Sequence, residues 1–275
     1  MITYNKTEKR TKRLIEISSE KSVSNWLTTL HLSEYGFELS KQQFWDAVRL
    51  RYGWNIPKLP TTCPCGSKFD IQHSMSCKKG GFISIRHNDL RDLTANMLSE
   101  VCKDTEIEPR LQTLTGEQLN NRTANRSDEA RLDIRARGVW ARGQQAFFDL
   151  RVFDPNACRY LNKSLKQCHV MNKQEKKRAY NKRVLQVEHG TFTPLVFSIY
   201  GSMGRECHSF YSRLAELISE KRDLPKSVTV NWIRTKLCFT LVKSSLLCLR
   251  GSRAVCRRVA DFECDIDVAH KMTKI

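Results

Sequence analysis

Apolar residues recur at helical spacing in several long stretches of the chain. Between residues 88 and 101 they follow an i, i+3, i+7, i+8, i+11 spacing, which predicts a helix with one buried face. Similar spacing predicts a helix that carries Phe210 and Leu214 on one face, followed by a closing helix at residues 228–249. Residues 1–57 also favour helices, up to a segment where two prolines break the pattern.

The middle of the chain favours strands. We expect strands at residues 130–137 and 145–153, joined by a glycine-containing hairpin, and a strongly apolar strand at residues 192–200. A lysine-rich helix is expected at residues 173–187, and the polar, turn-rich residues 115–129 predict a loop. The order of helix, strands, helix, strand and helices is typical of an α/β fold with a mixed sheet.

A large excess of basic residues favours polyanionic binding partners. The 47 Lys and Arg against 29 Asp and Glu give a formal net charge of +18, which favours polyanions through long-range attraction and counterion release. DNA is the first candidate partner and RNA the second, with a basic solvated surface as the alternative interpretation. Because 40% of the residues are hydrophobic, the chain has enough apolar surface for a core and is not a disordered tail.

Cysteine usage and apolar run length indicate the compartment. Eleven Cys in a chain of 275 residues, behind a charged N-terminus without the apolar stretch of a secretory signal, favour reduced thiols over a disulfide scaffold. No apolar run approaches the roughly 18 residues that a membrane helix needs. We therefore expect an intracellular, reducing location, nuclear or cytoplasmic, and no membrane partner.

Four potential metal ligands cluster in the turn-rich segment after the N-terminal helices. They are Cys63, Cys65, His73 and Cys77. Three thiolates and an imidazole form a tetrahedral zinc set, although the single residue between the first two cysteines is shorter than the usual spacing. The alternative is a group of reduced core cysteines with a surface histidine. The sequence predicts a structural zinc knuckle here.

Two aspartates stand on the two strands that the hairpin joins. Because side chains alternate along a strand, we expect Leu132 and Ile134 to share one face and Asp133 to point to the other. Asp149 and Arg151 likewise share the less apolar face of the second strand. If the strands pair, the two carboxylates approach each other, and Mg²⁺ or Mn²⁺ relieves their repulsion. The alternative is two isolated acids, since one Asp on a strand is common.

The lysine-rich helix could supply a cation to these acids. Lys173, Lys177 and Tyr180 follow an i, i+4, i+7 spacing and share one face. A lysine on this helix could orient an attacking water or neutralise a phosphate. The alternative is a solvated basic face without a catalytic role.

The order of these elements resembles a known family. The knuckle, then Arg86-His87-Asn88 at the start of a helix, the two aspartates and the Lys/Tyr helix together resemble the restriction-like endonuclease of site-specific non-LTR retrotransposons, a member of the PD-(D/E)XK superfamily. The resemblance covers roughly residues 60–200. Residues 26–54 also resemble the linker that follows the reverse transcriptase in such elements. The resemblance implies a restriction-endonuclease-like core with a mixed sheet flanked by helices.

The resemblance also implies roles for individual residues, starting with catalytic Mg²⁺ or Mn²⁺ on the two aspartates. The implied catalytic residues are Asp133, Asp149, Lys177 as the first choice of helix lysine, Lys176 as the second, and Arg151. Arg151 stands where the family has a lysine and cannot give up its proton, so it could stabilise charge but not act as a base. The implied nucleic-acid contacts are Arg86, His87, Lys173 and Tyr180.

We expect four segments along the chain. They are a helical linker or end of an upstream module (1–59), the zinc knuckle (60–84), a restriction-like endonuclease domain (85–255) and a tail (256–275). The expected function is a metal-dependent DNA endonuclease that nicks target DNA for retrotransposon integration. One alternative is a non-catalytic nucleic-acid-binding zinc protein, from a decayed or domesticated element. Another is a structural zinc protein that binds a protein partner.

Overall fold

The computed structural model describes residues 2–21, 23–112 and 130–253. The expected loop at 115–129 and the expected tail at 256–275 lie outside the described residues. No helix among the residues described here has an apolar stretch that could span a lipid bilayer.

A four-stranded mixed sheet forms the centre of the molecule, as the sequence predicts for an α/β fold. Its order is β1 (Lys103–Ile107), β2 (Ile134–Arg137), β3 (Gln145–Phe153) and β4 (Thr191–Ser198). The first two pairings are antiparallel, and β3 pairs with β4 in parallel. β3 has the expected bounds, whereas β1 was not expected because its sequence, KDTEI, is polar and mostly exposed. Such a charged strand suits the edge of a sheet, where one side stays unpaired.

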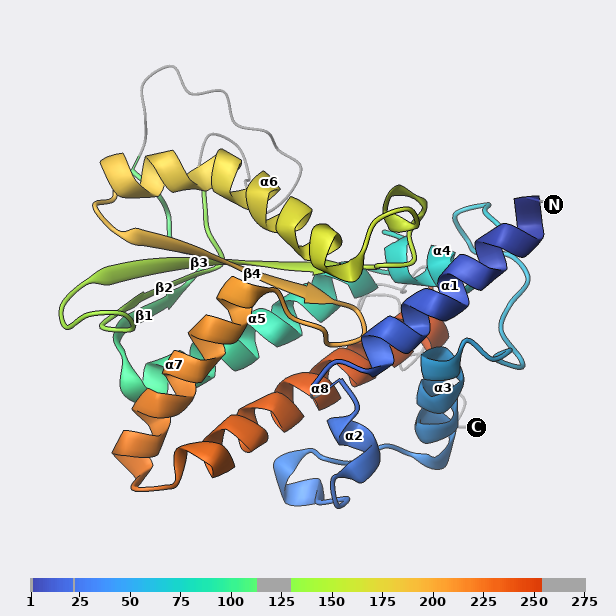
Figure 1. Cartoon of the computed structure of the whole chain (residues 1–275), viewed down its shortest axis with the longest axis horizontal. Helices are drawn as coiled ribbons and strands as arrows, with labels where there is room; N and C mark the ends of the chain where they lie inside the picture. Colours follow the sequence, from blue (N-terminus) through green and yellow to red (C-terminus); the bar gives the residue numbers. More distant parts are fainter. Residues whose placement is uncertain (1, 22, 113–129, 254–275) are drawn as a thin grey trace, which may run out of the picture.

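Helices cover both faces of this sheet (Figure 1). α6 (Leu165–Gln186) lies on one face, and α5 (Phe82–Val101), α7 (Arg205–Arg222) and α8 (Lys226–Arg250) lie on the other. α7 and α8 confirm the two helices that the sequence predicts for the C-terminal part. α5 and α6 both begin earlier than expected.

The early start of α6 has a local cause. Ser164 and Gln167 form a capping box: Ser164 Oγ accepts from the backbone N–H of Gln167 at 3.2 Å, and Gln167 Oε1 accepts from that of Ser164 at 2.7 Å. This arrangement satisfies two backbone donors that a helix start otherwise leaves unpaired. The Ser-x-x-Gln signal begins at Ser164, nine residues before Lys173, the expected start of the helix.

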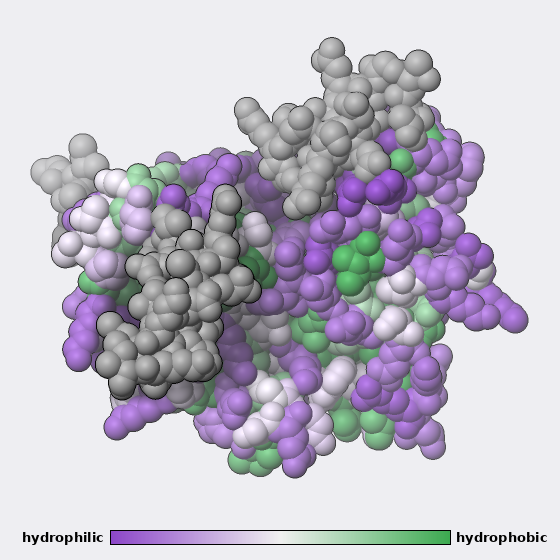
Figure 2. Space-filling view, turned by 180° about the vertical axis from the view of Figure 1, so that it is seen from behind, coloured by the Kyte–Doolittle hydropathy of each residue, from purple (hydrophilic) through white to green (hydrophobic). Residues whose placement is uncertain are grey.

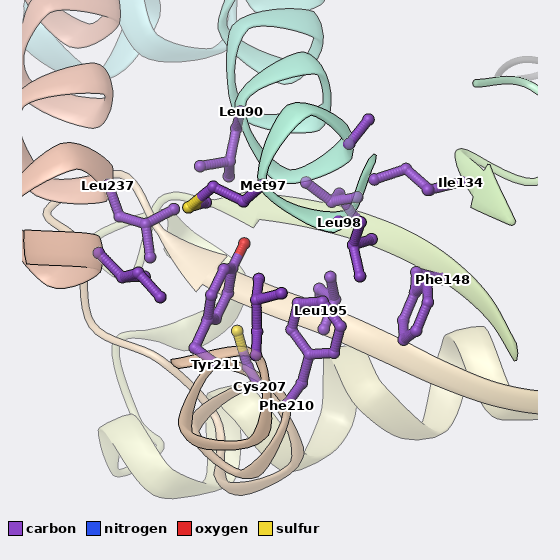
Figure 3. Close-up of a cluster of buried hydrophobic side chains, with 14 of the residues drawn as sticks. Leu90, Met97, Leu98, Ile134, Phe148, Leu195, Cys207, Phe210, Tyr211 and Leu237 are labelled. Atoms are coloured by element: carbon purple, nitrogen blue, oxygen red, sulfur yellow. The ribbon is translucent and has the colours of Figure 1, made fainter. Parts of the chain in front are cut away.

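The largest hydrophobic cluster fills the space between the sheet and α5, α7 and α8 (Figure 3). Leu90 and Leu98 of α5 meet Phe148 of β3 and Phe210 of α7, and all four are fully buried. Burial of such side chains stabilises the fold by about 2 kcal/mol each. The cluster therefore holds β3 and α5 in fixed positions, and both carry residues of the candidate site.

The expectation that the side chains of Leu132 and Ile134 point to the same face of the sheet is wrong. Leu132 packs with Phe147 and Val184 on the α6 side, whereas Ile134 packs in the cluster on the opposite side. The alternation of side chains fails because Asp133 forms a bend before β2 begins, so it is not part of the strand. The expected alternation along β3 is correct for Ala146, Phe148 and Leu150, which all join the larger cluster.

The N-terminal segment consists of helices, namely α1 (Ile2–Ser18), α2 (Asn25–Thr28), η1 (Ser33–Tyr35) and α3 (Lys41–Tyr52). Of these, α2 and α3 pack against α8, whereas α1 packs against α3 and α6. Trp26, Phe37 and Val48 share a hydrophobic cluster with Phe239 and Leu246 of α8. This segment and the C-terminal helix thus build one core. The face of the molecule in Figure 2 is largely hydrophilic, with small scattered hydrophobic patches.

Candidate metal centre and acidic site

The four expected knuckle ligands lie together. The ligand atoms of Cys63, Cys65, His73 and Cys77 are all within 4.8 Å of one another. The Sγ atoms of Cys63 and Cys77 are 3.7 Å apart, and Cys65 Sγ lies 3.3 Å from His73 Nε2. Two thiolates bound tetrahedrally to one zinc at about 2.3 Å stand about 3.7 Å apart. The cluster could therefore bind a metal ion, and its donors are those that zinc prefers.

A tight turn and a short helix place these ligands. Gly66 adopts φ 87° after Cys65, and its N–H donates to Cys63 O at 2.8 Å, which brings the two closely spaced cysteines to one side. α4 (Ile71–Ser76) then presents His73 and, at its end, Cys77, one helical turn apart. The Asp70 side chain caps this helix by accepting from the N–H of His73 at 2.7 Å.

The thiols of the knuckle differ in their electrostatics. Hydrogen bonds from the backbone and side chain of Ser67 lower the pKa of Cys65 to about 6, so its thiolate form is favoured at neutral pH. Burial raises the pKa of Cys63 above its ordinary value. A bound cation would stabilise both thiolates.

Two buried arginines join the knuckle to the rest of the molecule. Arg86 Nη2 donates to Met75 O at 3.2 Å, and Nη1 lies 3.7 Å from Cys248 Sγ of α8. Arg253 lies over the rings of Phe69 and Phe82, at about 5 Å from each. Arg86 is 3% exposed, so its guanidinium anchors the knuckle and is not on the surface where the resemblance places a DNA contact.

Sheet pairing brings the two aspartates together. Ile134 of β2 pairs with Phe148 of β3, so Asp133, just before β2, and Asp149, just after Phe148, lie near the same end of this pairing, and their charges interact. Both side chains are buried, at 3% and 5% exposure. Asp133 Oδ2 accepts a hydrogen bond from the backbone N–H of Leu150 at 2.5 Å, which ties this bend to β3.

A histidine and a lysine flank the acid pair, each on a different helix. His87 Nε2, in the first turns of α5, lies 3.2 Å from Asp133 Oδ2. Lys176 Nζ, in the middle of α6, lies 2.5 Å from Asp149 Oδ2. The lysine ammonium thus compensates the charge of this buried oxygen.

The two carboxyl groups titrate differently. Burial raises the pKa of Asp149 to about 6; Lys176 opposes this increase, and the negative charge of Asp133 adds to it. Burial alone would also raise the pKa of Asp133, but the hydrogen bond and charge of His87 lower it below its ordinary value. Asp133 is therefore the permanently charged member of the pair, and Asp149 is the member that takes up a proton first.

The acids act in turn on their cationic neighbours. Burial by itself lowers the pKa of Lys176, but the charges of Asp149 and Asp133 overcome this effect and raise it. Burial likewise lowers the pKa of His87, and the hydrogen bond to Asp133 raises it above the ordinary value. Lys176 therefore stays protonated at neutral pH.

Of the two adjacent helix lysines, Lys176 and not Lys177 lies beside the acid pair. Lys177 Nζ points to Glu206 of α7 at 2.8 Å, and Lys173 Nζ lies 3.5 Å from the same carboxylate. The stripe of α6 that faces the sheet contains the buried Asn172, with Lys176 one turn later. Lys173 and Lys177 each follow a residue of that stripe by one position in the sequence. Their side chains therefore point to another side of α6, where both lie near Glu206 of α7.

The remaining expected residues lie at the margin of the acid pair. Arg151 is about one-third exposed, and its guanidinium lies 3.9 Å from the carboxylate of Glu175 on α6. It therefore faces α6 and not the carboxylates of the two aspartates. The Tyr180 ring packs on Phe192 at 5.9 Å, with Lys176 Nζ 5.8 Å from its centroid. The sequence did not reveal that Glu206 pairs with Lys177 or that Glu175 lies near Arg151, because these contacts depend on how α6 packs against α7 and the sheet.

The chain matches no protein-family model and no curated protein in sequence comparisons.

Proposed function

We propose that this chain is a divalent-metal-dependent DNA endonuclease with a restriction-like core, which nicks target DNA for retrotransposon integration. The observation that carries the proposal is the convergence of two buried carboxylates, Asp133 and Asp149, beside the buried ammonium of Lys176. Burying two acids opposite each other costs stability unless a cation compensates them, so such pairs occur mostly where chemistry needs them.

The acid pair suits Mg²⁺ or Mn²⁺. Both ions prefer hard carboxylate oxygens, and a bound ion would take over from Lys176 the compensation of the charge on Asp149 Oδ2. A bound ion would polarise the phosphodiester and acidify a water molecule. Asp133 and Asp149 would hold the ion, with His87 fixing the orientation of Asp133.

Lys176 then has a defined role. The acids keep it protonated, so it can donate hydrogen bonds to a phosphate oxygen and offset developing negative charge, but it cannot accept a proton. The zinc proposed for the knuckle has a different role, because three cysteines and a histidine form a closed structural site without an open position for substrate.

A plasmid-nicking assay tests the proposal. The zinc-loaded protein is incubated with supercoiled DNA and Mg²⁺ or Mn²⁺, and we expect relaxation to the nicked circle. Asp133→Asn and Asp149→Asn should abolish nicking while DNA binding persists, and Asp149→Asn should also remove Mn²⁺ binding measured by calorimetry. Unchanged nicking in both variants would exclude the proposed site.

Adjacent lysines on α6 provide a matched control. Lys176→Ala should reduce the nicking rate by about 100-fold, the usual effect of removing one donor to a developing charge. Lys177→Ala should stay within about twofold, because that ammonium is paired with Glu206. Equal losses in the two variants would show that the helix contributes only its general basic charge.

One observation favours a second candidate function, a nucleic-acid-binding zinc protein that does not cut. Arg151 occupies the position of the family's lysine and faces Glu175. In that case the same assay gives salt-sensitive DNA binding without nicking in either metal.

A further inference from the structure

Three exposed aromatic side chains lie on α3 and in the turn that follows it, away from the acid pair in the sequence. Trp45, Tyr52 and Trp54 are 46%, 52% and 54% exposed. Trp45 and Tyr52 are seven positions apart, so they lie on the same side of the helix. Large aromatic side chains usually contribute to cores, and a group of them in water commonly marks a binding surface.

The backbone holds two of these rings in a fixed arrangement. Gly53 ends α3 with φ 68°, in the left-handed region, and the N–H of Trp54 turns back to donate to Arg49 O at 2.8 Å. The turn places Trp54 on Tyr52 with ring centroids 5.2 Å apart and an interplanar angle of 26°. The stack is thus formed before any ligand arrives, which lowers the entropy cost of binding.

Arginines accompany these rings. The guanidinium of Arg49 lies 5.8 Å from the Trp45 ring centroid, and that of Arg51 lies 5.6 Å from the Tyr52 ring centroid. The acid of the same helix, Asp46, is buried and paired with Arg250 at 2.8 Å. Arg49 Nη1 also lies 3.9 Å from Asp46 Oδ1, and Arg51 Nη2 donates to Ser18 O at 3.4 Å. The surface therefore combines flat rings with two positive charges.

This combination matches the chemistry of a single-stranded nucleic acid. Unpaired bases present flat faces that stack on aromatic rings whatever the sequence, and their phosphates attract guanidinium groups. In a duplex the bases are stacked on each other, so their faces are not available to such a surface. The arginines and the net charge of +18 favour a polyanion over an apolar protein partner.

We propose that Trp45, Tyr52 and Trp54, with Arg49 and Arg51, form a stacking surface for single-stranded nucleic acid, separate from the acid pair. The stacked Tyr52 and Trp54 form its centre; Arg49, whose side chain is 30% exposed, contacts a phosphate, and the partly buried Arg51 adds positive charge to the same surface. The site would hold the unpaired strand of a nucleic acid without reading its sequence.

The test measures binding of a fluorescein-labelled 12-nucleotide oligo-dT and of a duplex of equal length, by anisotropy, with the full zinc-loaded chain. No Mg²⁺ is added, so the result does not depend on whether the acids cleave DNA. The Tyr52→Ala/Trp54→Ala double variant should weaken oligo-dT binding by about tenfold or more, since stacking on one base is worth about 1–3 kcal/mol. Duplex binding should change by less than about twofold.

Control variants separate stacking from folding and charge. Tyr52→Phe/Trp54→Phe should restore most of the oligo-dT affinity, because the flat rings remain. Tyr35→Ala removes an aromatic side chain that is 48% exposed in η1, and Arg142→Ala removes an exposed charge of the β2–β3 hairpin; both should leave the affinity unchanged. Thermal unfolding verifies that each variant is folded.

Three results would overturn the proposal. The first is an oligo-dT affinity that the double alanine variant leaves unchanged, and the second is an equal loss for the duplex. The third is a change of the chain's oligomeric state in the double variant, measured by sedimentation without nucleic acid, which would assign the surface to a second copy of the chain.

Discussion

The knuckle, which could bind a metal ion, and the acid pair, where we propose a second ion, are assembled in opposite ways. The knuckle takes all its ligands from one stretch of 15 residues, Cys63 to Cys77, and has only a small apolar cluster around Phe69. The acid pair joins Asp133, in the bend before β2, to Asp149 of β3, supported by His87 and Lys176 from two helices, above a large core. A site with little core depends on its ion for folding, whereas a site built on a packed sheet keeps its shape without one.

The largest expected effect tests the dependence of the knuckle on its ion. Cys77→Ser should abolish binding of one zinc and lower the unfolding temperature by about 10 °C. A closed zinc site contributes several kcal/mol of stability, and each kcal/mol shifts the unfolding temperature of a chain of this size by about 2–4 °C. Zinc release with a colorimetric chelator and a thermal melt measure both. Cys158→Ser, at an exposed free cysteine, is the control and should change neither. A knuckle that melts identically with and without zinc would contradict this comparison.

Removing the histidine beside the acid pair should leave the fold intact but weaken metal binding. His87→Ala removes the donor that orients Asp133, so Mn²⁺ affinity should fall by about 10–100-fold, the usual cost of losing a group that positions a ligand. Calorimetric titration of Mn²⁺ into the zinc-loaded protein checks this. An unchanged affinity would mean that Leu150 N–H alone orients the carboxylate.

The acid pair should also bind metal in a pH-dependent manner. Because the pKa of Asp149 is raised to about 6, protons compete with the ion below that pH, and Mn²⁺ affinity should fall by about tenfold per pH unit. Without metal, the stability of the fold should depend on pH in the opposite direction. The folded state binds the proton of Asp149 more tightly than the unfolded chain does, so Asp149 favours folding at low pH, and this contribution is lost as pH rises through about 6. Mn²⁺ titrations between pH 5 and 8 test the prediction, and equal affinities across that range would refute it.

The smallest effect concerns the helix that carries Lys176. Ser164→Ala removes the cap of α6 and should lower the free energy of unfolding by about 1 kcal/mol, with a small change in unfolding temperature. Chemical denaturation measures this loss. Zinc binding should be unaffected, because the knuckle is assembled from a different part of the chain.

Sequence reasoning predicted some elements closely and others poorly. β3 and α8 follow strong apolar patterns, and their bounds agree with expectation to within about two residues. β1 escaped because an exposed, charged edge strand carries no apolar alternation. Asp133 was placed in a strand because the pattern around it alternates, and a pattern cannot reveal a bend whose carboxylate is held by the N–H of Leu150.

The sequence by itself determined the ligand set of the knuckle, because four ligands in 15 residues on a turn and a short helix can meet without help from the rest of the fold. It also determined the α/β class, through the period of its apolar positions. Only the tertiary structure decided that Lys176 and not Lys177 faces the acids, and that Arg86 is buried against α8. The physical reason is that adjacent helix positions point about 100° apart, so the neighbouring element selects which side chain enters the site.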